Sequence, residues 1–188
     1  MARLRSAEKR KAILDAAVEE FAQAGLGAPT AKIARRAEVA EGTLFTYFAN
    51  KDELLNELYL ELKAEVYQRV NTHFPATAGL RERAWHVWST YLGWALEFPE
   101  RRKVSAQLNL SDVVSAETRK KAAVGRENID SALAELGERS VVRELPAGFA
   151  AATMAAMQEA TMEFAAKHPK QRKALIEKAF EVYWKIFQ

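Results

Sequence analysis

The polar side chains best suited to contact a nucleic acid lie in one short run, residues 33–51 of this 188-residue chain. Gly42 allows a close approach to a phosphate backbone or a base, and Thr43 offers both a hydroxyl for phosphate and a methyl group for thymine. Tyr47 can reach a phosphate with its hydroxyl, and Lys51 can pair with one as a point charge. The run therefore predicts a surface that contacts both phosphates and base edges.

The spacing of apolar residues makes the same run a helix, a tight turn and a second helix. Val39 lies just past the predicted turn, and small Ala34 allows two helices to cross closely, as a helix-turn-helix requires. The two apolar stripes consist of Ile33, Ala34 and Ala37, followed by Leu44, Tyr47 and Phe48. This arrangement presents the start of the second helix to a major groove.

The segment Gly42-Thr43-Leu44-Phe45-Thr46-Tyr47-Phe48-x-x-Lys51 resembles the recognition helix of the TetR family of bacterial transcriptional regulators. Motifs support the resemblance over roughly residues 10–60, and beyond them only the helix pattern and the length agree. It implies a cytoplasmic homodimer that binds double-stranded operator DNA and releases it when a small ligand enters a second domain. From the resemblance and the side-chain chemistry together, we expect DNA contacts from Thr30, Lys32, Glu41, Gly42, Thr43, Phe45, Thr46, Tyr47 and Lys51.

Four residues depart from the usual pattern of that family. Glu38 occupies a turn position that normally holds Gly and often needs a positive φ, and Ala40 stands where Ser usually caps the recognition helix. Phe45 replaces a more common Tyr, so it loses a hydroxyl but can meet a thymine methyl group. Glu41 can accept a hydrogen bond from a cytosine amine or repel phosphates. These residues leave the base preference open.

Composition and charge favour a mostly helical protein with a basic N-terminal part. The chain is 49% hydrophobic and has only eight Gly and five Pro. Its net charge is +3, and residues 1–51 carry all of it, with nine basic against six acidic side chains. Five of these basic groups lie in residues 1–11, as expected of an arm that contacts phosphates, although a solvated terminus fits equally well. No Cys is present, which excludes disulfides and fits the cytoplasm.

The predicted fold is all-α, with an N-terminal three-helix helix-turn-helix DNA-binding domain (1–51) and a six-helix ligand-binding and dimerisation bundle (52–188). Periodicity and turn residues place the nine helices as follows. We expect them near residues 7–24, 29–37, 41–48, 51–73, 80–98, 99–110, 116–137, 146–168 and 170–187. Asn50 and Glu53 form a capping-box pattern at the start of the fourth helix.

The last two predicted helices carry more apolar surface than one domain needs, which favours a dimer interface. The alternative is that both helices are central to a single bundle. The interface residues that we expect are Ala152, Ala155, Leu175, Ala179, Phe180 and Tyr183. A pocket for an apolar or aromatic ligand rests mostly on the resemblance, since such side chains also build ordinary cores. Its candidate lining is Trp85, Trp88, Tyr91, Trp94, Gln107, Met154, Met157 and Gln158.

Catalysis finds no support in the chain. The three His are far apart, and Glu159 and Glu163 lack the Glu-x-x-His partners of a di-iron bundle. There is no Gly-rich phosphate loop. We therefore expect no enzyme activity, no cofactor and no metal. The longest uncharged stretch near the middle of the chain, Ala84–Leu96, is 13 residues, which is too short to span a membrane. A helical adaptor that acts through protein contacts remains the alternative to DNA binding.

Overall fold

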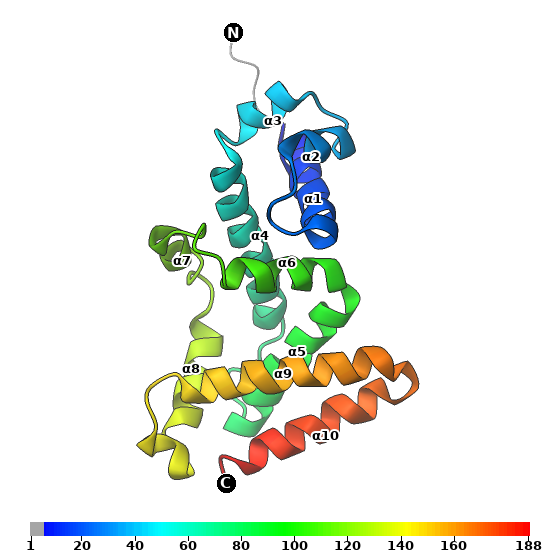
Figure 1. The fold of residues 1–188 in the computed structure, drawn as a ribbon. Coiled ribbons are helices and arrows are strands. Elements are labelled where there is room, and N and C mark those ends of the chain that lie inside the picture. Colours follow the sequence, from blue (N-terminus) through cyan, green and yellow to red (C-terminus); the bar gives the residue numbers. More distant parts are fainter. Residues whose placement is uncertain (1–5) are drawn as a thin grey trace. The chain divides into compact units, whose positions relative to one another are not determined.

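The computed structural model describes residues 6–188 except the side chain of Ser140, and these residues form helices without a strand (Figure 1). The all-α prediction is therefore confirmed. None of the helices in residues 6–188 is long and apolar enough to cross a membrane. The α-helices are α1 (Ala7–Ala24), α2 (Thr30–Arg36), α3 (Glu41–Tyr47), α4 (Lys51–Asn71), α5 (Leu80–Glu97), α6 (Pro99–Asn109), α7 (Ala116–Lys121), α8 (Glu127–Gly137), α9 (Phe149–Lys167) and α10 (Arg172–Lys185). The short 3-10 helices are η1 (Ser140–Glu144) and η2 (Pro169–Gln171).

Contacts between residues divide the chain into two compact units, and each unit combines two separate segments of the sequence. The first unit contains the described residues up to Glu65 together with Phe98–Ala123. The second unit contains Val66–Glu97 together with Val124–Gln188. The sequence places a boundary after residue 51, whereas the contacts bring α6, α7 and the start of α4 to the helix-turn-helix. Helix α6 joins the first unit because it packs on α1.

Local signals in the sequence explain where α1 begins and ends. The Ser6 side chain caps the helix by accepting a hydrogen bond from the Lys9 backbone N–H at 3.4 Å. Gly25 ends it at φ 77°, a conformation that an L side chain rarely adopts. Between these ends, Ile13 and Phe21 are fully buried and form the core of the first unit with Ile33 and Leu44.

The single helix that we predicted over 116–137 is wrong, because the structure has two helices there. Ser115 caps α7 as expected, and its Oγ accepts from the Thr118 N–H at 3.0 Å. The chain then turns at Gly125, which has φ 84°, before α8 begins. The Asn71 side chain donates to the Gly125 carbonyl at 2.8 Å, so a contact distant in the sequence stabilises the break.

The core of the second unit is aromatic. Trp88 lies in its centre, with its indole N–H donating to the Ile176 carbonyl at 3.1 Å and its ring stacked on Tyr183. The Tyr183 hydroxyl donates to the Ala150 carbonyl at 3.2 Å, which ties α10 to the start of α9. Helices α9 and α10 pack against each other and run in opposite directions from the short connection between them (Figure 1).

Candidate nucleic-acid interface

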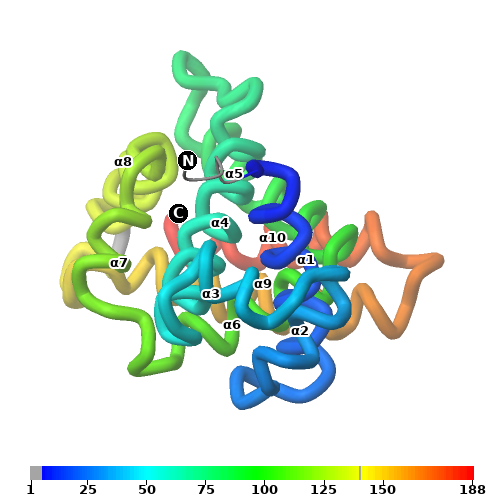
Figure 2. The backbone as a smooth tube through the Cα atoms, turned by 90° about the horizontal axis from the view of Figure 1, so that it is seen from above, coloured from blue at the N-terminus to red at the C-terminus, as the bar shows by residue number. Residues whose placement is uncertain are grey.

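Helices α2 and α3 meet through a tight turn in which Glu38 is strained. Figure 2 shows the two short helices next to each other, and the Val39 N–H donates across the turn to the Ala34 carbonyl at 3.0 Å. Ala34 is 2% exposed, so it lies in the helix crossing as expected of a small residue. Glu38 has φ 55°, which costs a non-Gly residue free energy. The positive φ that the sequence predicts for this turn is therefore confirmed.

The start of α3 is held by a side chain of α2 instead of by its own cap. Ala40 precedes the helix and makes no side-chain capping bond, as predicted. Thr30, at the start of α2, donates its hydroxyl to a carboxylate oxygen of Glu41 at 2.8 Å. The bond joins the first residues of two helices eleven positions apart. Both residues are among the DNA contacts expected from the sequence, but the sequence does not pair them, because neither residue type requires the other.

The far end of α3 is tied to the start of α1. The Ser6 N–H donates to the Tyr47 hydroxyl oxygen at 2.9 Å, across 41 positions of sequence. A phenol has one hydrogen of its own, which this bond leaves available as a donor to a phosphate. The Thr46 hydroxyl donates to the Gly42 carbonyl at 3.0 Å, so its hydrogen is engaged within the helix. Both ends of α3 are thus positioned by other helices.

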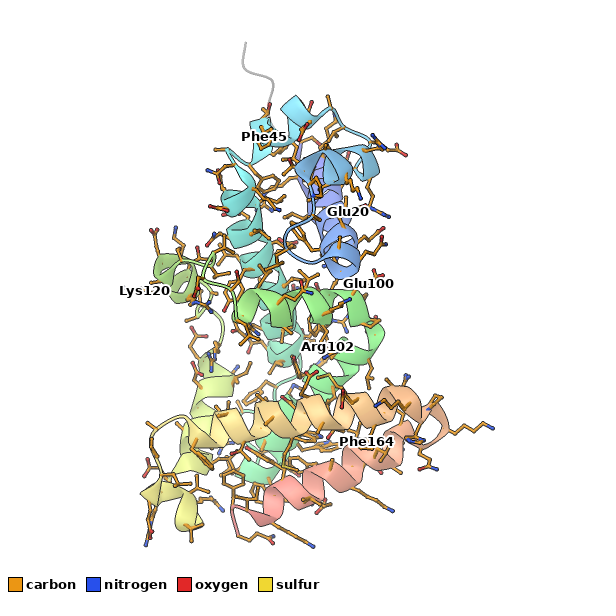
Figure 3. The ribbon with its side chains drawn as sticks, viewed as in Figure 1. Glu20, Phe45, Glu100, Arg102, Lys120 and Phe164 are labelled. Atoms are coloured by element: carbon orange, nitrogen blue, oxygen red, sulfur yellow. The ribbon has the colours of Figure 1, made fainter. Side chains whose placement is uncertain are left out.

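One side of α3 is exposed and the other forms core. Leu44 and Phe48 are buried at 0% and 1% exposure, whereas the Phe45 side chain is 41% exposed (Figure 3). Six of the predicted contacts lie on α3 and are at least partly exposed, namely Glu41, Gly42, Thr43, Phe45, Thr46 and Tyr47. These residues share one short helix, so the structure brings together most of the predicted DNA surface.

The basic side chains near α3 differ in whether they form ion pairs with carboxylates of the protein. Lys32 is exposed on α2, and the Lys51 ammonium lies 5.8 Å from the centre of the Phe21 ring. Arg36 is committed elsewhere, because it donates to Glu20 and Glu19 at 2.6 Å each. The hydrogen bond to Glu20, followed by the one to Glu19, raises the pKa of Arg36. The basic arm also includes Arg3 and Arg5, which lie outside the described residues.

Helix α4 begins at a capping box close to α3. The Asn50 side chain accepts from the Glu53 N–H at 2.8 Å, and the Glu53 carboxylate accepts from the Ala49 N–H at 2.7 Å. This confirms the capping box that the sequence predicts. Further along α4, Glu57 accepts a hydrogen bond from Arg10 of α1 at 2.5 Å. Lys51 therefore starts a helix whose position is fixed relative to α1.

Arg101 of α6 connects three helices of the first unit. Its guanidinium donates to Asp15 of α1 at 2.5 Å and to Glu65 of α4 at 2.9 Å. Nearby, the Lys103 ammonium donates to the Ala22 carbonyl at 2.6 Å, in the last turn of α1. These links were not predicted from the sequence, since pairs 86 and 81 positions apart leave no periodic signal. They support α1, and through it the base of the helix-turn-helix.

Half of the predicted pocket residues lie in the packed core of the second unit. Trp88, Trp94, Met154 and Gln158 are at most 6% exposed, and the Gln158 amide donates to the Trp88 carbonyl at 3.4 Å. Tyr91 and Met157 are half-buried. Gln107 belongs to the first unit, where its Oε1 is buried and accepts no hydrogen bond from the described residues.

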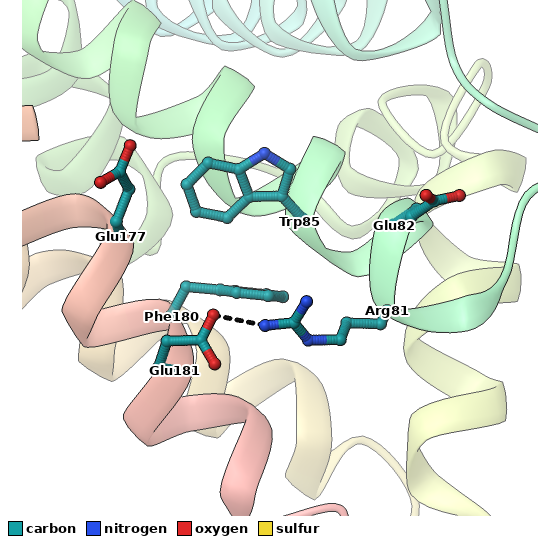
Figure 4. Close-up of a pocket in the computed structure, with 6 residues that line it drawn as sticks. All are labelled: Arg81, Glu82, Trp85, Glu177, Phe180 and Glu181. Atoms are coloured by element: carbon teal, nitrogen blue, oxygen red, sulfur yellow. Dashed lines mark hydrogen bonds and ion pairs between the residues drawn. The ribbon is translucent and has the colours of Figure 1, made fainter.

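A small cavity of about 200 Å³ lies between α5 and α10 and includes Trp85 (Figure 4). Its aromatic wall is Trp85 against Phe180, with ring centres 5.0 Å apart and the rings edge to face. Arg81 pairs with Glu181 and lies over the Phe180 ring. Glu82 and Glu177 complete the lining. Among residues 6–188, no group of three or more His, Asp or Glu side chains could hold a metal ion.

The predicted dimer residues fall into two groups. Ala152 and Ala155 are exposed on α9, and Leu175 and Ala179 are half-buried on α10. Phe180 and Tyr183 are 2% and 0% exposed, because both rings pack against Trp88 within their own unit. Exposed Phe164 on α9 and Val182 on α10, at 55% and 58%, are further apolar surface (Figure 3). The exposed side of α9 is therefore rich in alanine, whereas the exposed side of α10 is mostly charged and includes Val182.

Comparison with known proteins places the helix-turn-helix in a known family. Residues 13–58 match the family of bacterial regulatory proteins called tetR. Over 67 residues the chain is 39% identical to YhgD, an uncharacterised HTH-type transcriptional regulator of Bacillus subtilis. That match covers 35% of this chain and 35% of YhgD, so the chain spans about a third of the curated relative it matches.

Solved structures extend the likeness to the whole fold. A regulator from Shewanella sp. PV-4 assigned to the tetR family aligns with 97% of this chain and 98% of its own, at a TM-score of 0.72 and 26% identity. The transcriptional regulator FadR of Bacillus subtilis, solved in complex with stearoyl-CoA, aligns with 92% of this chain and 96% of its own. Its TM-score is 0.69 at 22% identity, which shows a shared fold.

Proposed function

Because the chain belongs to the TetR family of bacterial transcriptional regulators, we propose that it represses transcription by binding a palindromic DNA operator as a homodimer. A small ligand in the second unit releases the protein from DNA. Repression needs only that the protein occupies a promoter. The bacterial cytoplasm is the compartment in which such a protein meets its operator.

The observation that carries the DNA-binding proposal is the exposed side of α3, held at both ends. Tyr47 is fixed by the Ser6 N–H and Glu41 by the Thr30 hydroxyl, so the helix offers a preorganised surface. In the proposed complex, Gly42 and Thr43 approach the DNA at the start of the helix. Three side chains contact phosphates, those of Lys32, Tyr47 and Lys51. The remaining predicted contacts, Thr30, Glu41, Phe45 and Thr46, belong to the same DNA-facing surface.

Gel retardation with the promoter region of the protein's own gene tests this function. We expect salt-dependent binding at low ionic strength, because phosphate contacts release counterions. Lys51→Ala removes one phosphate contact, so it weakens binding to all sequences and lowers the salt slope by about 1. Lys120→Ala on α7 is the matched control, since it removes the same charge from an exposed position in the same unit. Absence of any retarded complex at low salt contradicts the proposal.

The homodimer rests on the exposed small residues of α9 and on Leu175 and Ala179 of α10. A single helix-turn-helix makes few contacts, and a dimer doubles them on a palindrome. Ala155→Arg introduces a charge into the proposed interface, so we expect a monomer by light scattering. Ala123→Arg, at an exposed position in the first unit, is the control and leaves the dimer intact. A wild-type monomer at micromolar concentration contradicts this part.

The ligand that we propose is small and apolar or aromatic. FadR of Bacillus subtilis was solved with stearoyl-CoA, whose acyl chain is such a group. Trp85, Trp88, Tyr91, Trp94, Met154 and Met157 supply aromatic and thioether surface in the second unit. A ligand releases DNA only if it binds the two states of the protein with different affinity. The test is tryptophan fluorescence for binding, followed by operator retardation with and without the compound; a tight ligand that leaves operator affinity unchanged contradicts release.

A further inference from the structure

Two exposed side chains of α3 distinguish this recognition surface, the Glu41 carboxylate and the Phe45 ring. The other polar side chains towards the end of the helix already have partners, since Thr46 donates to the Gly42 carbonyl and Tyr47 accepts from Ser6. Glu41 keeps a carboxylate oxygen that accepts no hydrogen bond within residues 6–188. Phe45, at 41% exposure, is a large apolar side chain of α3 that faces solvent, in contrast to the buried Leu44.

The Glu41 carboxylate can only accept hydrogen bonds, which limits the bases that it can recognise. In the major groove, cytosine presents an N4 amine donor, and adenine presents an N6 amine beside its N7 acceptor. The adenine N7 lone pair repels a carboxylate that bonds the neighbouring amine. Guanine presents two acceptors and no donor, so it repels the carboxylate outright. Cytosine is therefore the best partner for Glu41.

The bond from Thr30 makes this recognition directional. Because the Thr30 hydroxyl holds one carboxylate oxygen at 2.8 Å, the side chain loses rotational freedom before any DNA is bound. The second oxygen is then presented from the start of α3, where a recognition helix meets the base edges. An oriented carboxylate discriminates between bases better than a mobile one.

The Phe45 ring complements one group of the major groove. The thymine C5-methyl is the apolar feature of the base edges there, and Phe is one of the side chains that contact it. Burying an exposed aromatic ring against a methyl group removes apolar surface from water, which favours thymine at that position. Phe45 follows Glu41 by four residues, so both side chains lie on the same side of α3.

We propose that each half of the operator carries a C·G pair read by Glu41 and a T·A pair read by Phe45, at most about two base pairs apart. Four residues of an α-helix rise about 6 Å, which corresponds to about two base-pair steps of 3.4 Å. This inference rests on the proposed DNA binding and names the sequence that the binding selects. Glu41 also repels phosphates, so it lowers affinity for non-cognate DNA while it adds discrimination.

Selection of bound duplexes from a random DNA library tests the base assignment. The wild-type protein enriches a palindrome with a C·G pair and a nearby T·A pair in each half. Glu41→Gln enriches A·T at the former C·G position, because an amide bonds adenine N6 and N7 together. Glu41→Lys enriches G·C there, because an ammonium bonds the guanine acceptors. Phe45→Ala lowers the preference for thymine by roughly tenfold, the usual weight of one good base contact.

Two further variants separate base reading from a general charge effect. Glu100→Gln removes the same charge from an exposed position on α6. We expect this variant to enrich the same DNA sequence as the wild-type protein. Thr30→Val removes only the hydroxyl that orients Glu41, and we expect C·G to be kept with severalfold lower discrimination. Circular dichroism checks that each variant is folded.

The possible outcomes distinguish this inference from the function on which it rests. If Glu41→Gln and Glu41→Lys bind DNA and enrich the same base pair as the wild type, Glu41 does not read that position and the inference is wrong. If Phe45→Ala keeps the full thymine preference, Phe45 does not read the T·A pair and that assignment is wrong. If the wild-type protein enriches no sequence and retards no DNA at low salt, the proposed function itself fails.

Discussion

All four tryptophans of the chain lie in the second unit. The buried residues of the first unit are mainly aliphatic, although they also include the aromatic Phe21 and Phe48. The second unit gathers Trp88, Phe180 and Tyr183 around one another, with ring centres 5.6–6.3 Å apart. The first unit adds polar links between helices, such as Arg101 with Asp15 and Glu65.

This difference between polar links and aromatic packing indicates which substitutions should destabilise each unit most. A small helix-turn-helix buries little apolar surface, so side-chain hydrogen bonds between helices help to fix its geometry. An aromatic core buries more apolar surface per residue, so its stability depends on packing. Tryptophan fluorescence consequently reports on the second unit alone, while circular dichroism reports on all helices.

The largest effect should come from Trp88→Ala in the second unit. Trp88 is 0% exposed, and its removal leaves a cavity and takes away the indole bond to the Ile176 carbonyl, so we expect a loss of about 3–5 kcal/mol in the free energy of unfolding. Urea denaturation followed by circular dichroism measures it. Phe45→Ala is the control in the first unit, with a cost of about 0.5 kcal/mol because the ring is exposed. Equal losses for both variants would abolish the contrast.

Arg101→Ala should be the most damaging change to a polar link of the first unit. It leaves the carboxylates of Asp15 and Glu65 without this partner, and because both are partly exposed we expect a loss of about 1–2 kcal/mol. Amide hydrogen exchange should show faster exchange in α1. The Lys121→Ala variant breaks an exposed i,i+4 pair on α7 and should cost about 0.3–0.5 kcal/mol. A loss no greater than this control would show that Arg101 adds nothing to the unit.

Tyr183→Phe tests a polar group inside the aromatic core. The lost bond to the Ala150 carbonyl should cost about 1 kcal/mol near pH 7. Burial raises the pKa of Tyr183 above its ordinary value, so the phenol stays neutral in the folded state when the unfolded chain already ionises. This stabilisation is complete below about pH 10 and declines as the pH rises further.

Denaturation of Tyr183→Phe between neutral pH and pH 11 should therefore show less alkaline destabilisation than the wild type. Tyr59→Phe removes a buried phenol from the first unit and serves as the comparison. If wild type and Tyr183→Phe lose stability in parallel above pH 10, the Tyr183 phenol is not the group responsible.

The smallest effect concerns the turn before α3. Glu38→Gly relieves a positive φ of 55° but gives the unfolded chain more freedom, so we expect a net gain of about 0.5–1 kcal/mol. Thermal unfolding measures it. Glu38→Ala removes the same carboxylate and keeps the strain, so it should give no such gain. A gain of equal size in both variants would assign the effect to the charge instead of the backbone.

Much of the fold follows from local residues. The predicted bounds of α1 agree with Ala7–Ala24, because Ser6 and Gly25 act on their own neighbouring backbone groups. The positive φ of Glu38 and the capping box of Asn50 with Glu53 were predictable for the same reason. The break at Gly125 was not, since a Gly within helical periodicity is compatible with either outcome.

Within the candidate site, the sequence identified residue types but not their partners. Thr30 and Glu41 both appear among the expected DNA contacts, yet only the packing of α2 on α3 brings the hydroxyl to the carboxylate. The same is true of Ser6 with Tyr47. Phe180 and Tyr183 have the apolar character expected at an interface, but burial against Trp88 decides how they are used within the unit.

The sequence by itself determined the helical character, the helix-turn-helix and the apolar and polar sides of α3, because these depend on residues within a few positions of one another. Tertiary structure decided that α6 supports α1, that Thr30 orients Glu41, and which aromatic residues become core. Those outcomes depend on side chains distant in the sequence meeting in space, and neither periodicity nor residue type specifies such pairs.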